Sequence, residues 1–206
     1  MEKIDFRKAM RPFYDPPVGR FEIVDLPPMS FFMIDGKGDP NRSPDYAQAV
    51  AALYAVSYTL KFVSKHALGR DYVVPPLEGL WWADDMESFK TREKEKWPWT
   101  MMIMVPDFVE PEMAREAIAA AAKKKDLPAL GKLRVQELRE GRAAQTMHVG
   151  SYDSEGPILA YLHDQFLPAN GLVESGFHHE IYLGDPRRTV PEKLRTVLRQ
   201  PVMPRE

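Results

Sequence analysis

A glutamate near the end of the chain is the residue whose type and setting most suggest chemistry. Glu180 stands in an otherwise apolar segment, 178–183, where an unpaired buried carboxylate would be costly. Side chains alternate along a strand, so His178, Glu180 and Tyr182 share one face. We expect the other face, which includes Ile181, to join the core and the Glu180 face to be open to a ligand. The alternative is a solvent-facing glutamate, since charged residues are mostly exposed.

A second glutamate occupies a similar setting in the first half of the chain. Glu78 and Trp82 share a face of the strand predicted over 77–82. In each half a strand ends at glycine, a helix follows, and a later strand carries a glutamate close to aromatic residues. The order predicts pseudo-repeats over about 21–105 and 132–184, with Glu78 and Glu180 at matching positions.

Four tryptophans lie within nineteen residues of one another, namely Trp81, Trp82, Trp97 and Trp99. Aromatic walls stack on flat ligands and attract cations through their π faces, so this cluster beside a carboxylate suits a planar or cationic molecule. For any one tryptophan, core packing is the better explanation. For at least one of the four we favour a pocket.

Tyr54, Tyr58 and Lys61 are spaced to lie along one flank of a helix. A tyrosine beside a lysine is a candidate acid–base pair. The more common explanation is the half-exposed edge of a core helix with its lysine reaching toward water, and we prefer it here.

Several functional classes receive little support. The net charge is −2, which gives no electrostatic case for nucleic acid or an anionic membrane. There is no cysteine, and the two adjacent histidines point to opposite faces, so we expect no metal and no cofactor. The N-terminus lacks the apolar stretch of a signal peptide, and no run is long enough to span a bilayer, which predicts a cytoplasmic protein without membrane or nucleic-acid partners.

The coarse element pattern is α+β. Helices are predicted over 45–66, 110–125 and 154–166, with a last short helix from Pro191, and strands over 21–25, 31–36, 77–82, 100–105 and 177–183. Segments 133–138 and 143–149 flank Glu140-Gly141 and predict a hairpin. A charged linker runs from Asp84 to Lys96. Without a sharp change in composition we expect a single domain over 1–206.

Four segments together resemble the stand-alone GyrI-like small-molecule-binding proteins. They are 32–41 (FMIDGKGDPN), 53–61 (LYAVSYTLK), 77–82 (LEGLWW) and 178–183 (HHEIYL), and the similarity extends to 195–201. The resemblance implies a duplicated antiparallel sheet with two main helices on one face and a ligand groove on the other. It also implies that Glu180 lies in that groove. Regulators in this family carry a fused helix-turn-helix module, for which the residues before Phe21 are too few.

The resemblance also raises the question of catalysis. A subset of GyrI-like proteins hydrolyses cyclopropane-bearing, DNA-alkylating natural products through an aromatic cage. Here Glu180 would activate water, and Tyr182 or Tyr58 would stabilise the developing phenolate. We expect Glu180 and Tyr182 as catalytic residues. The expected ligand-binding residues are Glu78, Trp82, Trp99, Tyr58, Tyr152 and His178.

Two functions therefore remain open. One is a detoxifying hydrolase; the other is a protein that sequesters or senses an aromatic ligand without turnover. Both need the aromatic walls and a carboxylate, and only the enzyme needs a positioned water and a proton donor. The sequence is compatible with a monomer or a homodimer.

Overall fold

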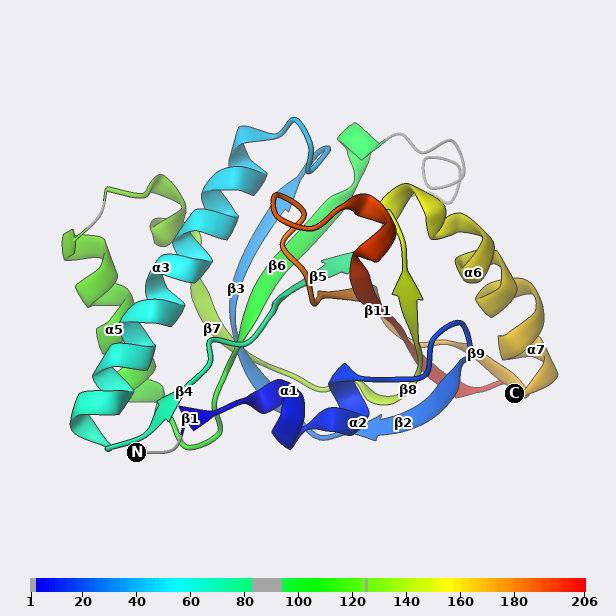
Figure 1. The fold of residues 1–206 in the computed structure, drawn as a ribbon, viewed down its shortest axis with the longest axis horizontal. Helices are drawn as coiled ribbons and strands as arrows, with labels where there is room; N and C mark the ends of the chain where they lie inside the picture. Colours follow the sequence, from blue (N-terminus) through cyan, green and yellow to red (C-terminus); the bar gives the residue numbers. More distant parts are fainter. Residues whose placement is uncertain (1–2, 83–93, 125) are drawn as a thin grey trace. The chain divides into compact units, whose positions relative to one another are not determined.

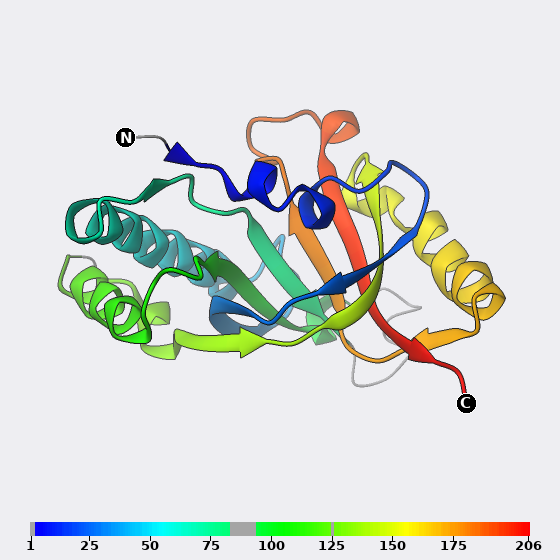
Figure 2. The ribbon, with the colours of Figure 1, turned by 90° about the horizontal axis from the view of Figure 1, so that it is seen from below.

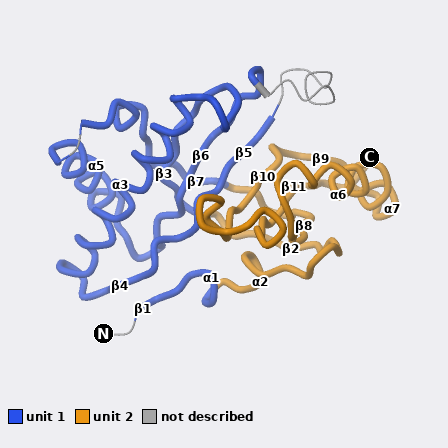
Figure 3. The backbone as a smooth tube through the Cα atoms, turned by 45° about the horizontal axis from the view of Figure 1, so that its top comes forward, with its two compact units in different colours: residues 1–9, 29–138 blue, residues 10–28, 139–206 orange. Residues whose placement is uncertain are grey.

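The computed structural model describes residues 3–82, 94–124 and 126–206, which form two compact units. Unit 1 comprises residues 1–9 and 29–138, and unit 2 comprises residues 10–28 and 139–206 (Figure 3). Most of the charged linker from Asp84 to Lys96 lies outside the described residues. None of the helices in the described part of the chain is long and apolar enough to cross a membrane.

Unit 1 contains an antiparallel sheet of four strands. In spatial order they are β5 (Leu77–Trp81), β6 (Pro98–Val105), β3 (Met29–Lys37) and β7 (Arg134–Leu138). Apolar residues occupy both faces of the two middle strands, and Phe31–Ile34 and Met101–Met104 are all buried. Continuous apolar runs of this kind are typical of strands that are covered on both faces.

Two helices of unit 1 lie side by side, α3 (Pro44–Ala67) and α5 (Pro111–Lys124) (Figures 1 and 2). Helix α3 begins where Ser43 Oγ accepts a hydrogen bond from the Tyr46 backbone N–H at 3.3 Å, with proline at the first helical position. Its buried residues recur every three or four positions and include Ala49, Leu53, Val56 and Leu60. Helix α5 buries Ala114, Ala117 and Ala121.

Trp99 identifies the sheet face that α3 covers. Its indole lies over Gly36 of β3, where an added Cβ would overlap the six-membered ring. The indole Nε1 donates to the Gly38 carbonyl at 3.2 Å, and the ring of Tyr46 on α3 meets Trp99 edge-on with centroids 5.4 Å apart. Trp81 pairs directly with Trp99 and also contacts Tyr46. Residues in register with this pair therefore face α3.

The remaining elements of unit 1 are short. A parallel pair, β1 (Lys3–Ile4) with β4 (Asp71–Tyr72), joins the N-terminal segment to the end of α3, and α1 (Phe6–Ala9) follows. Lys61 pairs with the Asp71 carboxylate and donates to the Tyr72 carbonyl. Two 3₁₀ turns complete the unit, η1 (Lys94–Lys96) and η2 (Pro128–Lys132).

The strands of unit 2 are likewise antiparallel. Its strands, in order, are β2 (Glu22–Leu26), β8 (Gly141–Val149), β11 (Arg195–Pro204) and β10 (His178–Tyr182), and β9 (Leu172–Glu174) pairs with the far end of β11. The short turns are α2 (Arg11–Tyr14), η3 (Tyr152–Ser154) and η5 (Pro191–Lys193). Strand β11 lies between β8 and β10 and is the centre of this unit.

A continuous helical segment covers one face of the unit 2 sheet. It consists of α6 (Gly156–Tyr161), a π-helical turn η4 (Leu162–Phe166) and α7 (Leu167–Ala169). Leu162 and Leu167 pack with Phe21 and Ala144, and the ring of Phe166 lies 5.3 Å from that of Phe21. The opposite face buries Tyr14, Met147, Ile181 and Val197 in a separate cluster, with Met10, Phe13 and Leu183 packed against it.

The α+β class and the antiparallel sheet are confirmed, as are the three long helical segments and the core position of Ile181. The hairpin predicted around Glu140-Gly141 is wrong, because β7 pairs with β3 whereas β8 has β2 and β11 as its neighbours. The last short helix is reduced to the turn η5. The strand after it, β11, was not predicted.

Candidate functional site

Strand β10 brings together the side chains expected to carry chemistry. The Tyr182 hydroxyl donates to Glu180 Oε2 at 2.8 Å, and His178 Nε2 lies 3.5 Å from Glu180 Oε1. The side chains of His178 and Glu180 are 9% and 15% exposed. Neither ring nitrogen of His178 has a hydrogen-bond partner among the described residues. Residues two apart on a strand share a face, which is why the three side chains converge.

Tyr152 adds a second aromatic ring to this group. It belongs to the turn η3, and its ring meets that of Tyr182 edge to face, with centroids 5.6 Å apart and planes at 81°. Burial, followed by the negative charges of Glu180, Glu155 and Asp185, raises the pKa of Tyr152 to about 12. Its hydroxyl therefore keeps its proton at neutral pH. Glu180, Tyr182, Tyr152 and His178 together are called the Glu180 cluster below.

The Glu180 cluster lies on the helix-covered face of the unit 2 sheet. Glu180 pairs with Leu198, which pairs with Thr146, and Ala144 shares the face of Thr146 by alternation. Ala144 packs against Leu162 of the helical segment. The resemblance had placed the glutamate on the face away from the helices; the register places it on the same face as α6.

Glu78 differs from Glu180 in this respect. Gly79 and its partner Met101 lie on the same face as Trp81 and Trp99, because residues two apart on a strand share a face. Glu78, whose partner is Met102, therefore lies on the other face. Glu78 therefore points away from α3, and it is fully buried. Relative to the helix of its own unit, Glu78 does not match Glu180, and Gly79 is the β5 residue on the equivalent face.

The remaining predicted ligand-binding residues belong to unit 1. Trp99 is fully buried and Trp82 is half-buried. Tyr58 is 50% exposed on α3, with its ring 6.4 Å from that of Tyr54. A small hollow of about 50 Å³ beside Trp99 is lined by residues that include Asp45, Gln48 and Lys132.

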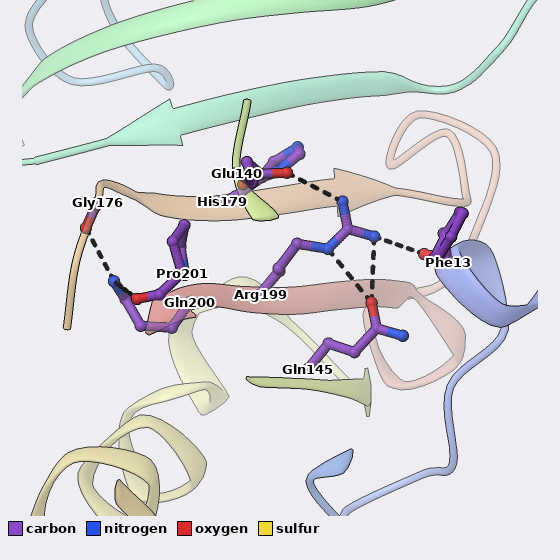
Figure 4. A network of polar contacts seen from close by, with 8 residues as sticks. All are labelled: Phe13, Glu140, Gln145, Gly176, His179, Arg199, Gln200 and Pro201. Atoms are coloured by element: carbon purple, nitrogen blue, oxygen red, sulfur yellow. Dashed lines mark hydrogen bonds and ion pairs between the residues drawn. The ribbon is translucent and has the colours of Figure 1, made fainter. Parts of the chain in front are cut away.

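Beneath strand β10, on the face opposite Glu180, lies a buried polar network that sequence analysis missed (Figure 4). His179 Nδ1 lies 2.9 Å from Glu140 Oε1, and Arg199 donates to Glu140 Oε2 at 3.4 Å. Arg199 also donates to Gln145 Oε1 at 3.1 and 3.2 Å and to the Phe13 carbonyl at 2.7 Å. These contacts tie β8, β10 and β11 to the N-terminal segment.

The charges of this network hold Glu140 ionised. Burial would by itself raise the pKa of Glu140, but the charge and hydrogen bond of His179, followed by those of Arg199, outweigh burial and lower the pKa to about 2. An arginine within an apolar strand is the available sequence signal, because a buried guanidinium requires a carboxylate or carbonyl partner.

The histidines and acids do not form a metal site that we can assign. Within residues 3–82, 94–124 and 126–206, no three His, Asp or Glu side chains gather closely enough to hold an ion. The chemistry available to the Glu180 cluster is that of an oriented carboxylate, a nearby imidazole and two phenols.

The chain belongs to the GyrI-like small molecule binding domain family, whose model matches residues 20–203. A hydrolase from Listeria innocua is 40% identical over 98% of this chain and 100% of that chain, with a TM-score of 0.83. An uncharacterized conserved protein from Listeria innocua has the same identity and coverage, with a TM-score of 0.89. No curated protein sequence matches the chain.

More distant structures share the fold alone. The C-terminal domain of EcmrR is 14% identical, covers 90% of this chain and 98% of its own, and has a TM-score of 0.55. The family assignment thus rests on the matched model and the close relatives. It establishes a small-molecule-binding domain, and the particular ligand and any turnover depend on the site itself.

Proposed function

We propose that the protein binds flat, largely apolar or cationic aromatic molecules at the Glu180 cluster and hydrolyses cyclopropane-bearing, DNA-alkylating members of that class as a detoxification. The observation that carries the proposal is the hydrogen bond from the Tyr182 hydroxyl to the Glu180 carboxylate, with the ring of Tyr152 against that of Tyr182. An oriented carboxylate with aromatic neighbours is suited to both binding and catalysis.

The binding part follows from the nature of these groups. The rings of Tyr152 and Tyr182 present an edge and a face at 81°, which can contact a flat molecule from two sides. The Glu180 carboxylate supplies negative charge beside those rings, and both features attract a cation. Because Glu180 is 15% exposed, the carboxylate is largely shielded from water while part of it stays accessible.

The catalytic part follows from the orientation of Glu180. Tyr182 occupies Oε2, so Oε1, which faces His178 at 3.5 Å, is the oxygen available to a water molecule. Glu180 would remove a proton from that water as it attacks the cyclopropane methylene carbon. The strained C–C bond breaks, and its electron pair moves into the conjugated ring to give a phenolate. General acid–base assistance of this kind contributes about 10²–10⁴-fold in rate.

Two relatives from Listeria innocua at 39–40% identity, both hydrolases, support an enzymatic function. The second candidate function is binding without turnover, as a protein that sequesters or senses its ligand. Membership of a small molecule binding domain family supports it, because binding is the property that the family shares.

The two candidates are separated by incubating the purified protein with a cyclopropane-bearing dienone and measuring products by mass spectrometry. Hydrolysis gives a product heavier by one water, and Glu180→Gln should lose this activity while calorimetry shows that it still binds an uncharged aromatic ketone. Binding without product would favour sequestration. Equal turnover by wild type and Glu180→Gln would refute the role of Glu180.

A further inference from the structure

The cluster contains two tyrosine hydroxyls, and they are not equally available to a ligand. The hydroxyl of Tyr182 is committed to Glu180 Oε2 at 2.8 Å. The hydroxyl of Tyr152 makes no hydrogen bond to the described residues, although its ring packs edge to face on Tyr182. A half-buried hydroxyl that has no hydrogen-bond partner in the described part of the chain is a donor that a ligand can use.

The turn that carries Tyr152 is fixed by several hydrogen bonds. Ser154 Oγ donates to the Ser151 carbonyl at 2.7 Å, and His148 Nε2 lies 3.1 Å from Ser154 Oγ. The Gly150 backbone N–H donates to the Leu194 carbonyl at 3.0 Å, which joins the turn to the start of β11. Because the turn is held on both sides, the phenol of Tyr152 has a defined position in the cluster.

The surrounding charges also keep the Tyr152 hydroxyl protonated, so that it can donate a hydrogen bond. Glu180, Glu155 and Asp185 all act electrostatically on its hydroxyl, and a phenolate there would be repelled by three carboxylates. The same carboxylates disfavour an anionic ligand oxygen that has no donor beside it. A protonated phenol at this place can accept the developing charge on a ligand oxygen by sharing its proton.

From these observations we propose that Tyr152 is the hydrogen-bond donor to an oxygen of the bound ligand, with Tyr182 serving as the residue that positions Glu180. The inference rests on the proposed function, and it assigns the ligand a class: a flat aromatic or dienone molecule with a carbonyl or phenolic oxygen. In hydrolysis, the Tyr152 hydroxyl then stabilises the developing phenolate by donating a hydrogen bond to it.

The hydrolytic step is balanced with these two residues. Glu180 takes one proton from water, the water oxygen bonds to the methylene carbon, and the broken C–C bond delivers its electron pair to the dienone oxygen. Tyr152 donates a hydrogen bond to that oxygen and keeps its own proton, and the first product is a phenolate. The proton on Glu180 then passes through solvent to this phenolate, so one water is consumed, the product is a phenol and Glu180 is restored.

The binding test uses a matched pair of probes, 9-fluorenone and fluorene, each carrying the same trimethylammonium-methyl group for solubility. The two differ only in the carbonyl oxygen. Calorimetric titration should show that Tyr152→Phe weakens binding of the ketone by about 2- to 10-fold and leaves binding of the hydrocarbon unchanged. Tyr182→Phe is the matched control and should affect both probes alike.

The kinetic test uses a series of cyclopropane-bearing dienones whose phenol products differ in acidity. Tyr152→Phe should lower kcat by about 10²-fold with a smaller change in KM, and the loss should be greatest for the least acidic phenols. A merely structural role would reduce turnover of all members equally. The unfolding midpoint of each variant confirms that it is folded.

The outcomes separate the inference from the function on which it rests. If wild type binds both probes and Tyr152→Phe binds them equally well, Tyr152 is not the donor, while aromatic binding stands. Selective weakening of the ketone by Tyr182→Phe would likewise transfer the role to Tyr182. If wild type binds neither probe, the proposed binding function is refuted, and the assignment of Tyr152 fails with it.

Discussion

The strands of both units pair in antiparallel fashion, but the interiors of the two units are built differently. In unit 1 the middle strands are filled by apolar residues such as Phe32 and Ile103, and an indole packs directly on the backbone of Gly36. In unit 2 the central strand carries Arg199, which is 1% exposed and hydrogen-bonded to Glu140 and Gln145. Unit 2 thus adds a buried network of paired charges to its apolar clusters.

The difference explains where the chemistry gathers. The polar network contacts one face of β10 and thereby fixes the register of that strand. A strand with a fixed register can hold a carboxylate in a defined position on its other face. His179 contributes to the network and its neighbour Glu180 to the cluster, so one strand serves both faces. On β5 of unit 1, Gly79 and Trp81 lie on the face that α3 covers, and Glu78 lies on the opposite face.

The largest expected contrast is between the two glutamates. Glu180→Gln should reduce turnover of a cyclopropane-bearing dienone by about 10²–10⁴-fold with little change in unfolding free energy. Glu78→Gln should do the reverse, costing about 1–3 kcal/mol of stability because Glu78 is fully buried, with turnover per folded molecule preserved. Steady-state kinetics measures turnover, and urea unfolding measures stability. Loss of turnover in folded Glu78→Gln would contradict the prediction, because both glutamates would then be needed for activity.

The next largest effect should come from the network of unit 2. Arg199→Ala leaves the carboxylate of Glu140 without one of its cationic partners and should cost about 3–5 kcal/mol in unfolding free energy. Arg195→Ala, on the same strand, removes only a half-exposed pair with Asp15 and should cost less than about 1 kcal/mol. Denaturant unfolding of both variants measures the two losses in unfolding free energy. Similar losses would mean that the buried pair of Arg199 stabilises unit 2 no more than the half-exposed pair of Arg195.

A smaller effect should follow from overpacking unit 1. Gly36→Ala introduces a methyl group into the volume of the Trp99 indole and should cost about 1–3 kcal/mol. Gly131→Ala is the control, because a Cβ there meets no atom within 4 Å, and its effect should be near zero. Thermal unfolding measures the two, and an unaltered midpoint for Gly36→Ala would show that the indole can move aside at little cost.

The smallest effect is a dependence of stability on pH. The pKa of Glu140 is lowered from 4.5 to about 2, so its ionised form stabilises the fold above pH 4.5, and that contribution is lost as pH falls toward 2. Between pH 4.5 and 3 the loss should amount to about 1–2 kcal/mol. Glu140→Gln should lack this component of the acid transition. Parallel pH profiles for the two proteins would contradict the assigned ionisation.

Much of the fold could be predicted from local patterns. The apolar repeat of α3 with its Ser43-Pro44 start, and the strands around Phe32 and Ile181, follow from period and capping alone. The shared face of Glu180 and Tyr182 was also predictable, since alternation is a local property. Tyr152 was among the residues expected to bind the ligand, but its contact with Tyr182 depends on the three-dimensional path of its turn.

What could not be predicted depends on partners distant in sequence. Strand β11 contains Arg199, Gln200 and two prolines, so its sequence lacks the usual pattern of a central strand. Burial of Arg199 is tolerable because it pairs with Glu140, 59 residues away, and also donates to Gln145 and to the Phe13 carbonyl. The face of Glu78 relative to α3 depends likewise on strand register, which the segment 77–82 does not contain.

The indole that packs on Gly36 has a spectroscopic consequence. All four tryptophans of the chain, at positions 81, 82, 97 and 99, fall within unit 1, whereas the aromatic residues of the Glu180 cluster are tyrosines and a histidine. Selective excitation of tryptophan therefore reports on unit 1, whereas far-ultraviolet dichroism reports on the backbone of both units. In Arg199→Ala the two signals should separate if unit 2 unfolds first, so the native aromatic residues serve as built-in reporters without any added label.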